Sequence, residues 1–316
     1  MRVIGQDEVR ARLTYEVCIP IVRQAMIALS RGETRQLLRS IIPLDQGRMF
    51  GVMPGALGER ACFGAKLVSV FPENFALGRQ SHQGVVVLFD GESGAPICVA
   101  HAGEITAIRT AAASAAATDA LARPEAHRLA LLGYGEEART HLRAISQVRA
   151  LSEVRVWGRD FGRAQAFAAE MSAETGLAVR ALAGGRAAVE GADIICTLTS
   201  SRTPVLHGDW VSAGAHINLV GSSYAGPVEV DHDLILRARL IADSREGVLA
   251  QGAEVLAAKA AGLIDDGHVV GEIGQVFDGA LEGRQSSDQI TAYKSLGHIV
   301  QDLASAQALM ERQSFR

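Results

Sequence analysis

The sequence predicts an α/β protein in which a doubly wound parallel sheet lies beside a smaller α+β domain. Three observations support this fold class. Apolar, strand-like runs alternate with helical patterns from Arg128 onward. The first of these runs leads directly into a glycine-containing turn and a helix. Residues 37–90, in contrast, hold short runs punctuated by glycine and proline. Strands that alternate with helices form βαβ units and a parallel sheet, whereas short punctuated strands form antiparallel sheets.

The size and composition are those of a globular protein with a full core. The chain has 316 residues, enough for two domains, of which 48% are hydrophobic and 21% charged. The formal net charge of −4 and the scattered basic residues argue against a nucleic-acid partner. Residues 1–12 carry charges throughout, unlike a signal peptide, and no apolar run approaches the length of a bilayer span. We therefore expect a cytoplasmic protein without a membrane partner.

The elements of the first domain follow from local patterns. Apolar residues recur at helical spacing over residues 7–31, and Gly32 is a helix stop signal. Turn residues such as those at 90–91 separate the strand-like runs of a mostly antiparallel sheet. These runs cover residues 37–43, 48–54, 61–70 and 84–90. An alanine-rich helix then spans about residues 105–123, and Pro124 ends it because proline disfavours a helical conformation in the preceding residue.

The second domain is predicted from the alternation itself. We expect strands at residues 128–132, 154–157, 178–180, 193–197, 216–220 and 240–243, and helices at 136–147, 163–170 and 186–189. Residues 291–310 have the pattern of a final helix, which we expect to pack back on the first domain. The predicted division is therefore 1–120 for the first domain, with the C-terminal helix 291–316, and 121–290 for the second.

The cysteines give no sign of a disulfide framework or a metal site. They are far apart, share no Cys-x-x-Cys spacing and sit in apolar runs: Cys18, Cys62, Cys98 and Cys196. Such residues are typical of inert buried thiols in a reducing compartment, so no metal is expected.

The turn at residues 133–138, Gly-Tyr-Gly-Glu-Glu-Ala, has the features of a phosphate-binding turn. It follows an apolar strand and opens a helix. Gly133 permits a tight turn, Gly135 lets the backbone approach a pyrophosphate, and Ala138 allows close packing of helix on strand. The free N–H groups of the helix N-terminus then bind the anion. The turn indicates a Rossmann-type domain that binds NAD(P)H, with a purely structural turn as the alternative.

The end of the second strand of this domain bears on the choice of cofactor. An acid there binds the ribose 2′-hydroxyl of NADH, whereas an arginine suits the 2′-phosphate of NADPH. The acid position falls on Gly158 and Arg159 follows, which slightly favours NADPH. Asp160 lies late for this contact but within reach of a hydroxyl, so the choice stays open.

Four segments together resemble a known family. They are the helix start at residues 104–118, Gly64-Ala65-Lys66, the run at 191–197, and Ile290-Thr291-x-x-Lys294-Ser295-x-Gly297. With the glycine turn they occur in the order typical of the ornithine cyclodeaminase/mu-crystallin family, nearly end to end. The resemblance implies an N-terminal substrate and dimerisation domain beside a Rossmann domain, usually in a homodimer. It also implies hydride transfer at a carbon–nitrogen bond: cyclodeamination, amino-acid dehydrogenation or reduction of imino acids.

The family's substrate-carboxylate cations match three positions here, Arg39, Lys66 and Arg109. Residue chemistry supports them. Arg109 is a charged residue in an Ala/Ile helix, and a guanidinium holds a carboxylate bidentately. Lys66 lies within an apolar strand, where an ammonium can bind a carboxylate or lend a proton. The alternatives are solvated arginines and, for Lys66, an edge-strand lysine that discourages aggregation.

Further candidates complete the predicted site. Arg48 is a fourth possible cation or a solvated turn residue, and His82 is a second possible proton donor or a hydrogen-bonded loop histidine. Ser222 and Ser223 would form a polar, uncharged wall for the substrate. The residues expected to contact the cofactor are Thr110, Gly133, Gly135, Glu136, Ala138, Arg159, Thr197, Ser200, Val220 and Gly221.

One departure from the family pattern narrows the reaction. The aspartate that cyclodeaminases carry after the fifth strand falls on Ser223, which can neither hold an ammonium nor act as a base. We therefore expect NAD(P)H-dependent reduction of a small α-imino acid, or the reverse dehydrogenation, with Lys66 as the first proton donor and His82 as the second. The candidate substrates are pyrroline- or piperideine-2-carboxylate, an acyclic imino acid, or iminosuccinate if Arg48 points inward. A cyclodeaminase and a non-catalytic NAD(P)H-binding protein are the alternatives.

Overall fold

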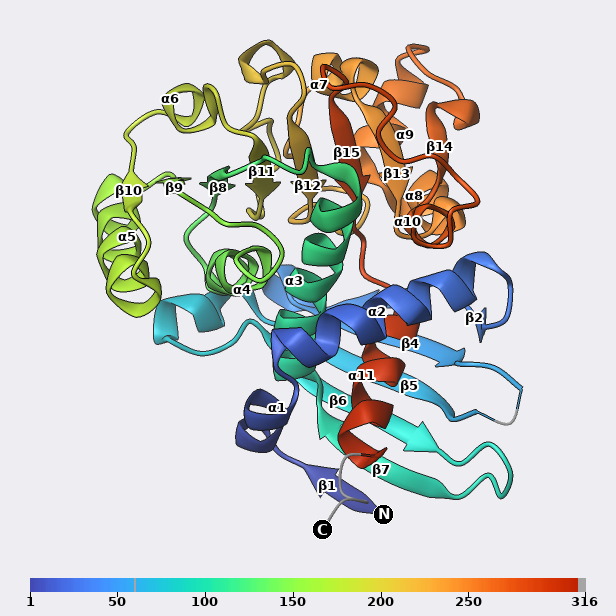
Figure 1. The fold of residues 1–316 in the computed structure, drawn as a ribbon. Helices are drawn as coiled ribbons and strands as arrows, with labels where there is room; N and C mark the ends of the chain where they lie inside the picture. Colours follow the sequence, from blue (N-terminus) through green and yellow to red (C-terminus); the bar gives the residue numbers. More distant parts are fainter. Residues whose placement is uncertain (60, 312–316) are drawn as a thin grey trace. The chain divides into compact units, whose positions relative to one another are not determined.

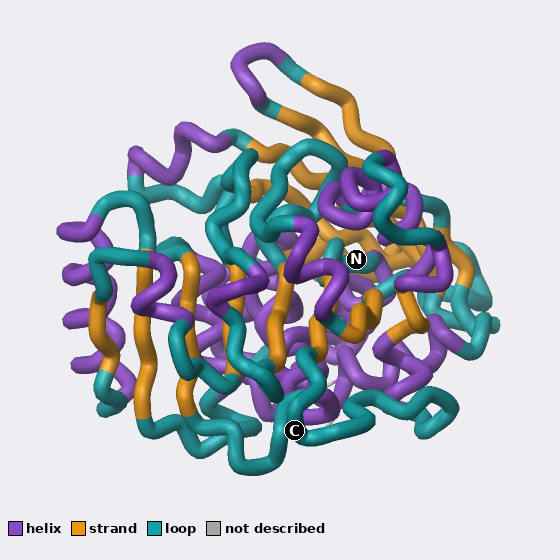
Figure 2. The backbone as a smooth tube through the Cα atoms, turned by 90° about the horizontal axis from the view of Figure 1, so that it is seen from above, coloured by secondary structure: helices purple, strands orange, loops and turns teal. Residues whose placement is uncertain are grey.

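The computed structural model describes residues 1–59 and 61–311, which divide into two compact units. Unit 1 contains Met1–Ala112 and the chain from His298 onward, and unit 2 contains Ala113–Gly297. The long helix α3 (Ala102–Leu121) belongs to both units, because the division falls after Ala112. Figure 1 labels the elements along the chain, and Figure 2 shows helices, strands and loops by colour.

Unit 1 contains a seven-stranded sheet in the order β1-β7-β6-β5-β4-β2, with β3 paired to β4. The strands are β1 (Arg2–Ile4), β2 (Arg35–Gln36), β3 (Ser40–Pro43), β4 (Met49–Ala56), β5 (Phe63–Val70), β6 (His82–Phe89) and β7 (Pro96–His101). The mostly antiparallel sheet is confirmed, and the one parallel pair joins β1 to β7. Prediction missed β1, β2 and β7 because two are only two or three residues long and the third follows a turn closely.

The predicted helix over residues 7–31 is wrong, because the chain forms two helices there. They are α1 (Gln6–Arg12) and α2 (Tyr15–Ser30). Leu13 and Thr14 leave the helical conformation between them, with ψ angles of 62° and 161°. Leu13 is nevertheless buried, so the apolar repeat continues through the break and hides it from a periodicity argument. Gly32 ends the second helix with a φ of 71°, as predicted.

The predicted helix from residue 291 is also wrong at its start. Thr291–Lys294 forms strand β15, Gly297 adopts a φ of 79°, and helix α11 covers Ile299–Glu311. Within unit 1 this helix packs on strands β4 to β7 and against α2 (Figure 1). Residues 312–316 of the predicted helix lie outside the described residues.

Unit 2 is built on an eight-stranded sheet in which every pair is parallel, in the order β10-β9-β8-β11-β12-β15-β13-β14 (Figure 1). Its strands are β8 (Arg128–Leu132), β9 (Glu153–Trp157), β10 (Val179–Ala181), β11 (Ile194–Thr197), β12 (His216–Leu219), β13 (Arg239–Ala242), β14 (Val269–Glu272) and β15. The doubly wound parallel sheet is confirmed. Strand β15 was read as helix because all four of its residues are buried and show no alternation.

Alternate residues of each central strand enter two separate hydrophobic cores, one on each face of this sheet. In β8, Leu129 and Leu131 pack with α4 and α5, whereas Ala130 and Leu132 pack with α6 to α9. The helices are α4 (Glu136–Ile145), α5 (Phe161–Thr175), α6 (Gly185–Val189), α7 (His232–Arg237), α8 (Arg245–Gln251), α9 (Ala253–Ala260) and α10 (Ile273–Phe277). Each fully buried leucine contributes about 1.5–3 kcal/mol, so helices on both faces stabilise the sheet.

Among the helices of residues 1–59 and 61–311, none is both long and apolar enough to cross a bilayer by itself. The bent pair α1 and α2, at 88° to each other, passes the same test on length and composition only.

Candidate active-site residues in the two units

Lys66 is buried in unit 1 by the alternation of strand β5. Only 3% of Lys66 is exposed, and Val68, two positions further along the strand, is also buried. Lys66 Nζ donates to Thr106 Oγ1 at 2.6 Å and to Asp302 Oδ1 at 3.1 Å. Thr106 Oγ1 in turn donates to the carbonyl oxygen of Ala102. An ammonium has three N–H donors, so these two contacts fix the side chain and leave one donor for another ligand.

Arg109 converges on the same carboxylate from helix α3. Its Nε donates to Asp302 Oδ1 at 3.2 Å and its Nη1 donates to Gln301 Oε1 at 2.8 Å. Asp302 is fully buried on α11, and no described residue hydrogen-bonds its Oδ2. The solvated-arginine alternative for Arg109 does not hold, because only 4% of the residue is exposed.

Electrostatics adjust the protonation of this cluster. Burial lowers the pKa of Lys66 to about 8, the negative charge of Asp302 raises it, and the positive charges of Arg109 and Arg39 lower it. Burial likewise raises the pKa of Asp302, but Arg109 and Lys66 outweigh it and hold the carboxyl below its usual range. Arg39 lies half-buried just before β3. Among the described residues, Lys66 and Arg109 thus place two cations on the single carboxylate of Asp302, which favours an anionic ligand.

The two histidines of this cluster are held in their neutral form. The surrounding protein lowers the pKa of His82 to about 4, and the charges of Lys66, Arg109 and Arg39 act in the same direction. His82 is exposed to solvent at the start of β6, and the three neighbouring cations disfavour imidazolium there. Burial and Arg39 also lower the pKa of His298 to about 4. A lowered pKa leaves His82 with less imidazolium to donate a proton at neutral pH, which favours Lys66 as the proton donor.

Arg48 does not join this cluster. Its guanidinium pairs with the carboxylate of Glu73 and lies over the ring of Phe71, 4.8 Å from the centroid. About a third of its side chain is exposed. Because Arg48 already forms an ion pair with Glu73, its position does not support a binding site for the second carboxylate of iminosuccinate.

Sequence reasoning missed Asp302, Gln301 and Thr106. Asp302 follows Lys66 by 236 residues along the chain, so no local spacing connects them. A signal was nevertheless present, because Gln301 and Asp302 are polar residues within the apolar pattern of the last helix, as Arg109 is in its own helix. The same argument that singled out Arg109 would have singled out its partner.

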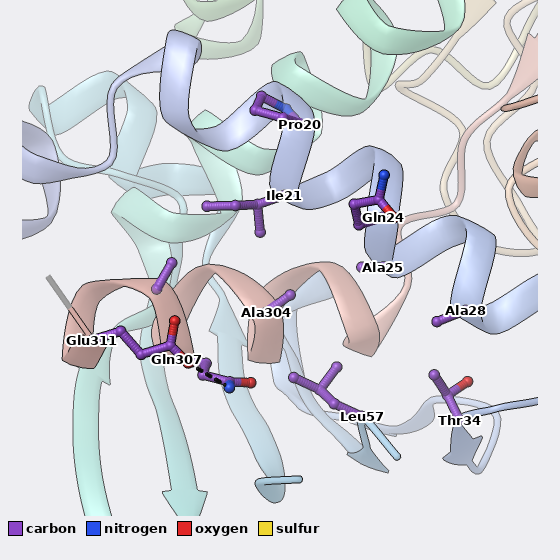
Figure 3. A pocket seen from close by; sticks show the side chains of 11 residues that line it. Pro20, Ile21, Gln24, Ala25, Ala28, Thr34, Leu57, Ala304, Gln307 and Glu311 are labelled. Atoms are coloured by element: carbon purple, nitrogen blue, oxygen red, sulfur yellow. Dashed lines mark hydrogen bonds between the residues drawn. The ribbon is translucent and has the colours of Figure 1, made fainter.

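Unit 1 also has an apolar groove of about 390 Å³ between α2 and α11 (Figure 3). The side chains that line it include Ile21, Ala25, Leu57 and Ala304. None of the predicted site residues lies along it, and its lining offers no cation for a carboxylate. The chemistry predicted for this chain therefore does not belong to this groove.

The glycine turn of unit 2 has the geometry that a dinucleotide pyrophosphate requires. Gly133 has a φ of 128°, and a Cβ there would lie 2.7 Å from the carbonyl oxygen of Leu198. Gly135 is the N-cap of helix α4 and has an extended backbone. Because glycine has no side chain, it forms no capping hydrogen bond to the first N–H groups of the helix. Glu136 follows as the first helical residue, and Ala138 is fully buried against the sheet. Residues 133–138 therefore fit an NAD(P)H pyrophosphate, because the helix N-terminus presents N–H donors without a side chain in the way.

The corner between β9 and α5 is closed to an acidic side chain at Gly158. The ring of Tyr134 covers this glycine, so a Cβ there would lie 2.2 Å from the ring. Asp160 is the N-cap of α5, and its Oδ1 accepts the backbone N–H of Arg163 at 3.0 Å. The guanidinium of Arg163 lies over Tyr134, 5.3 Å from the ring centroid, and Arg159, just after the end of β9, is exposed.

The predicted residues in the loops after β11 and β12 play different parts. The Thr197 hydroxyl is buried and donates to Glu229, so it shapes the loop rather than facing a ligand. Ser200 is exposed and Ser223 half-buried. Ser222 is fully buried in hydrogen bonds to Glu229 and Glu254, so it does not form the polar wall expected of it. Two further predicted residues are buried: Val220, in the loop that follows β12, and Thr110, on α3.

Comparison with known proteins adds an independent line of evidence. The model of the ornithine cyclodeaminase/mu-crystallin family matches residues 2–315. The ketimine reductase mu-crystallin of Mus musculus is 34% identical over 313 residues, which cover 98% of this chain and 96% of that protein.

Solved structures resemble the chain over its whole length. The Δ1-pyrroline-2-carboxylate reductase of Thermococcus litoralis, in complex with NADH and L-proline, matches with a TM-score of 0.94 and 32% identity, covering 99% of this chain and 97% of that one. The iminosuccinate reductase of Paracoccus denitrificans, in complex with NAD⁺, matches with a TM-score of 0.90 and 28% identity, covering 98% and 95%. An archaeal alanine dehydrogenase dimer with bound NAD matches with a TM-score of 0.91 and 26% identity, covering 98% and 94%.

Proposed function

The chain belongs to the ornithine cyclodeaminase/mu-crystallin family, and on this premise we propose that it is an NAD(P)H-dependent oxidoreductase that reduces the C=N bond of a small α-imino acid. The single observation that carries the proposal is the buried pair of cations, Lys66 and Arg109, on one carboxylate of Asp302. A protein that only stores or carries a dinucleotide has no use for these buried cations, whereas an imino acid needs both a carboxylate anchor and a proton.

The residues of unit 1 bind and protonate the substrate in this mechanism. Arg109, held by Asp302 and Gln301, offers its remaining guanidinium N–H groups to the α-carboxylate, and Arg39 adds a second cation. The third N–H of Lys66 donates to the imine nitrogen, so that the nitrogen gains a proton as its carbon gains a hydride. The nicotinamide supplies that hydride when the dinucleotide is bound. Lys66, left neutral, regains its proton from solvent between turnovers.

The same contacts favour a substrate with one carboxylate. Arg48 is paired with Glu73 and is not among the cations near Lys66. Pyrroline-2-carboxylate and piperideine-2-carboxylate each carry a single carboxylate and a ring C=N bond, so we place them before iminosuccinate. Ser223 stands where a cyclodeaminase needs a carboxylate, which makes cyclodeamination the less favoured activity.

We further propose NADPH as the preferred cofactor. Tyr134 prevents an acid at Gly158, and Asp160 already caps α5. The corner therefore offers Arg159 and the stacked Arg163, and guanidinium groups suit a phosphate dianion better than a hydroxyl.

We propose that the chain acts as a homodimer through unit 1. A run of large apolar side chains is exposed around β2 and β3: Leu37, Leu38, Ile41, Ile42 and Leu44. Contiguous exposed apolar residues mark an interaction surface, and a related alanine dehydrogenase is described as a dimer. Light scattering that returned the mass of a single chain at micromolar concentration would contradict this assignment.

The function is tested by following NADH and NADPH oxidation against a panel of imines. The panel holds pyrroline-2-carboxylate, piperideine-2-carboxylate, and pyruvate, glyoxylate and oxaloacetate, each oxo acid with ammonia. We expect turnover of a cyclic imine, and at least a hundredfold loss of kcat/KM in Lys66→Met. Tight NAD(P)H binding with no turnover on any member would instead favour a non-catalytic dinucleotide-binding protein.

A further inference from the structure

Two loops of unit 2 follow neighbouring strands and meet at one edge of the sheet. They are residues 198–201 after β11 and residues 220–223 after β12. The glycine turn follows β8, and the corner that distinguishes the two cofactors follows β9, on the other side of β8 from β11. Because the adenosine half of the dinucleotide belongs over β9, the nicotinamide half belongs over β11 and β12.

One buried carboxylate ties the two loops together. Glu229 is fully buried, and its Oε1 accepts the backbone N–H of Thr199 at 2.6 Å and the Thr199 hydroxyl at 2.8 Å. Its Oε2 accepts the hydroxyl of Thr197 at 2.8 Å and the backbone N–H of Ser222 at 3.2 Å. Four donors occupy the carboxylate, three from the first loop and its strand and one from the second.

The loops touch so closely that only glycine fits between them. A Cβ on Gly221 would lie 2.0 Å from the carbonyl oxygen of Thr199 and 2.6 Å from Glu229 Oε1. The backbone N–H of Gly221 also donates to the carbonyl oxygen of Thr197 at 3.1 Å. Any loosening of Glu229 therefore moves both loops.

A second buried carboxylate supports the first. Glu254 Oε1 accepts the backbone N–H of Glu229 at 3.1 Å and the hydroxyl of Ser222. Glu254 Oε2 pairs with Lys294 Nζ at 2.9 Å, and Lys294 donates to the Ser222 carbonyl oxygen at 2.7 Å. Lys294 thus pairs with Glu254 and acts on Glu229 through its charge. Two buried acids beside one cation are costly unless hydrogen bonds satisfy both acids.

We propose that Glu229 is a positioning residue for the nicotinamide half of the cofactor, fixing the two loops on which that half rests. The inference depends on the proposed function only in that the bound ligand is NAD(P)H. Glu229 does not touch the reacting atoms in this account; it acts through Thr199, Gly221 and Ser222. A carboxylate is required because a glutamine side chain has an NH₂ group where two of the four donors now point.

The experiment compares ligands that differ only by the nicotinamide ring. Dissociation constants are measured by calorimetry for NADH and ADP-ribose, and for NADPH and 2′-phospho-ADP-ribose, in the wild type and in Glu229→Gln. We expect the variant to weaken the complete cofactors about tenfold or more and the two ribose analogues less than about twofold. Glu174→Gln, an exposed acid paired with Arg143 on the same unit, serves as the matched control and should change none of these constants.

Equal weakening of both ligand classes would overturn the proposal, since Glu229 would then support the fold in general. Unchanged affinities would overturn it as well. Thr199→Val removes one of the four donors and keeps the side-chain shape, so it gives the same readout if Glu229→Gln does not fold. Binding is measured without an imine, so failure here is distinguishable from failure of the wild type to turn over any imine.

Discussion

At the scale of single residues, the chemistry of this chain depends on how Lys66 is held. Burial lowers the pKa of Lys66, and the negative charge of Asp302 opposes that shift. Thr106 and Asp302 together use two of its three donors and direct the third. The lysine is therefore both oriented and kept charged by residues that sequence spacing does not connect with it.

The expected pH dependence follows from the pKa of about 8 for Lys66. The charged form donates the proton, so kcat/KM should fall as the pH rises through about 8. In Asp302→Asn the negative charge that raises the pKa of Lys66 is gone, so the falling limb should move to lower pH. Imine reduction measured from pH 6 to pH 10 checks this.

Thr106→Val is the comparison for this experiment, because it removes a hydrogen bond to Lys66 without changing charge and should move the limb less. A limb that stays in place in Asp302→Asn would exclude Lys66 as the titrating donor. Removing one partner of a buried ion pair costs about 3–5 kcal/mol, so thermal unfolding of the variant is followed in parallel.

At the scale of elements, the corner where β9 meets α5 shows how packing restricts a binding choice. Tyr134 of the glycine turn lies on Gly158, and the same ring supports Arg163 from α5. The sequence places Asp160 near this corner, but the helix uses that side chain as its N-cap. The N-terminus of α5 thus uses Asp160 as its cap, although a motif argument would assign this acid to the cofactor.

The preference for NADPH should depend on the two arginines of this corner. We expect Arg159→Ala and Arg163→Ala each to lower the ratio of kcat/KM for NADPH to that for NADH by about tenfold, because each removes a charged hydrogen bond to the 2′-phosphate. Steady-state kinetics at fixed imine concentration give the ratio. Arg143→Ala, at an exposed ion pair with Glu174, should leave it unchanged. If the ratio also survives in both corner variants, the 2′-phosphate does not bind there.

At the scale of the whole molecule, stability should depend on buried histidines that stay neutral. Burial lowers the pKa of His141 to about 4 and that of His216 to about 3. His141 Nε2 lies 3.0 Å from Ser114 Oγ, and His216 Nδ1 lies 3.0 Å from Thr291 Oγ1. Both are fully buried in unit 2, one in a helix and one in a central strand.

Stability should therefore fall on acidification. Between the unfolded pKa of about 6.5 and the folded value near 4, the unfolded chain binds more protons than the folded one. For His141 the stabilisation is complete above pH 6.5 and is lost as the pH falls towards 4, by roughly 3 kcal/mol, and for His216 the loss continues towards pH 3. Denaturant unfolding at pH 5 and pH 7 checks the sign. His141→Gln should flatten the dependence, and a rise in stability on acidification would contradict the assignment of neutral buried histidines.

The sequence by itself determined the features that depend on local pattern. Alternating apolar runs predicted the parallel sheet, because strand and helix periods are properties of a few neighbouring residues. The turn at Gly133 and Gly135 and the charged residues Lys66 and Arg109 stood out against apolar surroundings for the same reason. These features can be recognised in the sequence without knowledge of the residues that they contact.

Tertiary structure decided everything that depends on partners far apart in the chain. It placed β15 between β12 and β13 although its sequence continues a helical pattern. It formed the ion pairs of Lys66 with Asp302 and of Arg48 with Glu73. It also brought the loops after β11 and β12 to the carboxylate of Glu229. Most of these contacts join residues separated by tens to hundreds of positions, and no period or motif encodes that distance. The geometry of these contacts, rather than residue type, shows that Lys66 and Arg109 belong to the candidate site and that Arg48 does not.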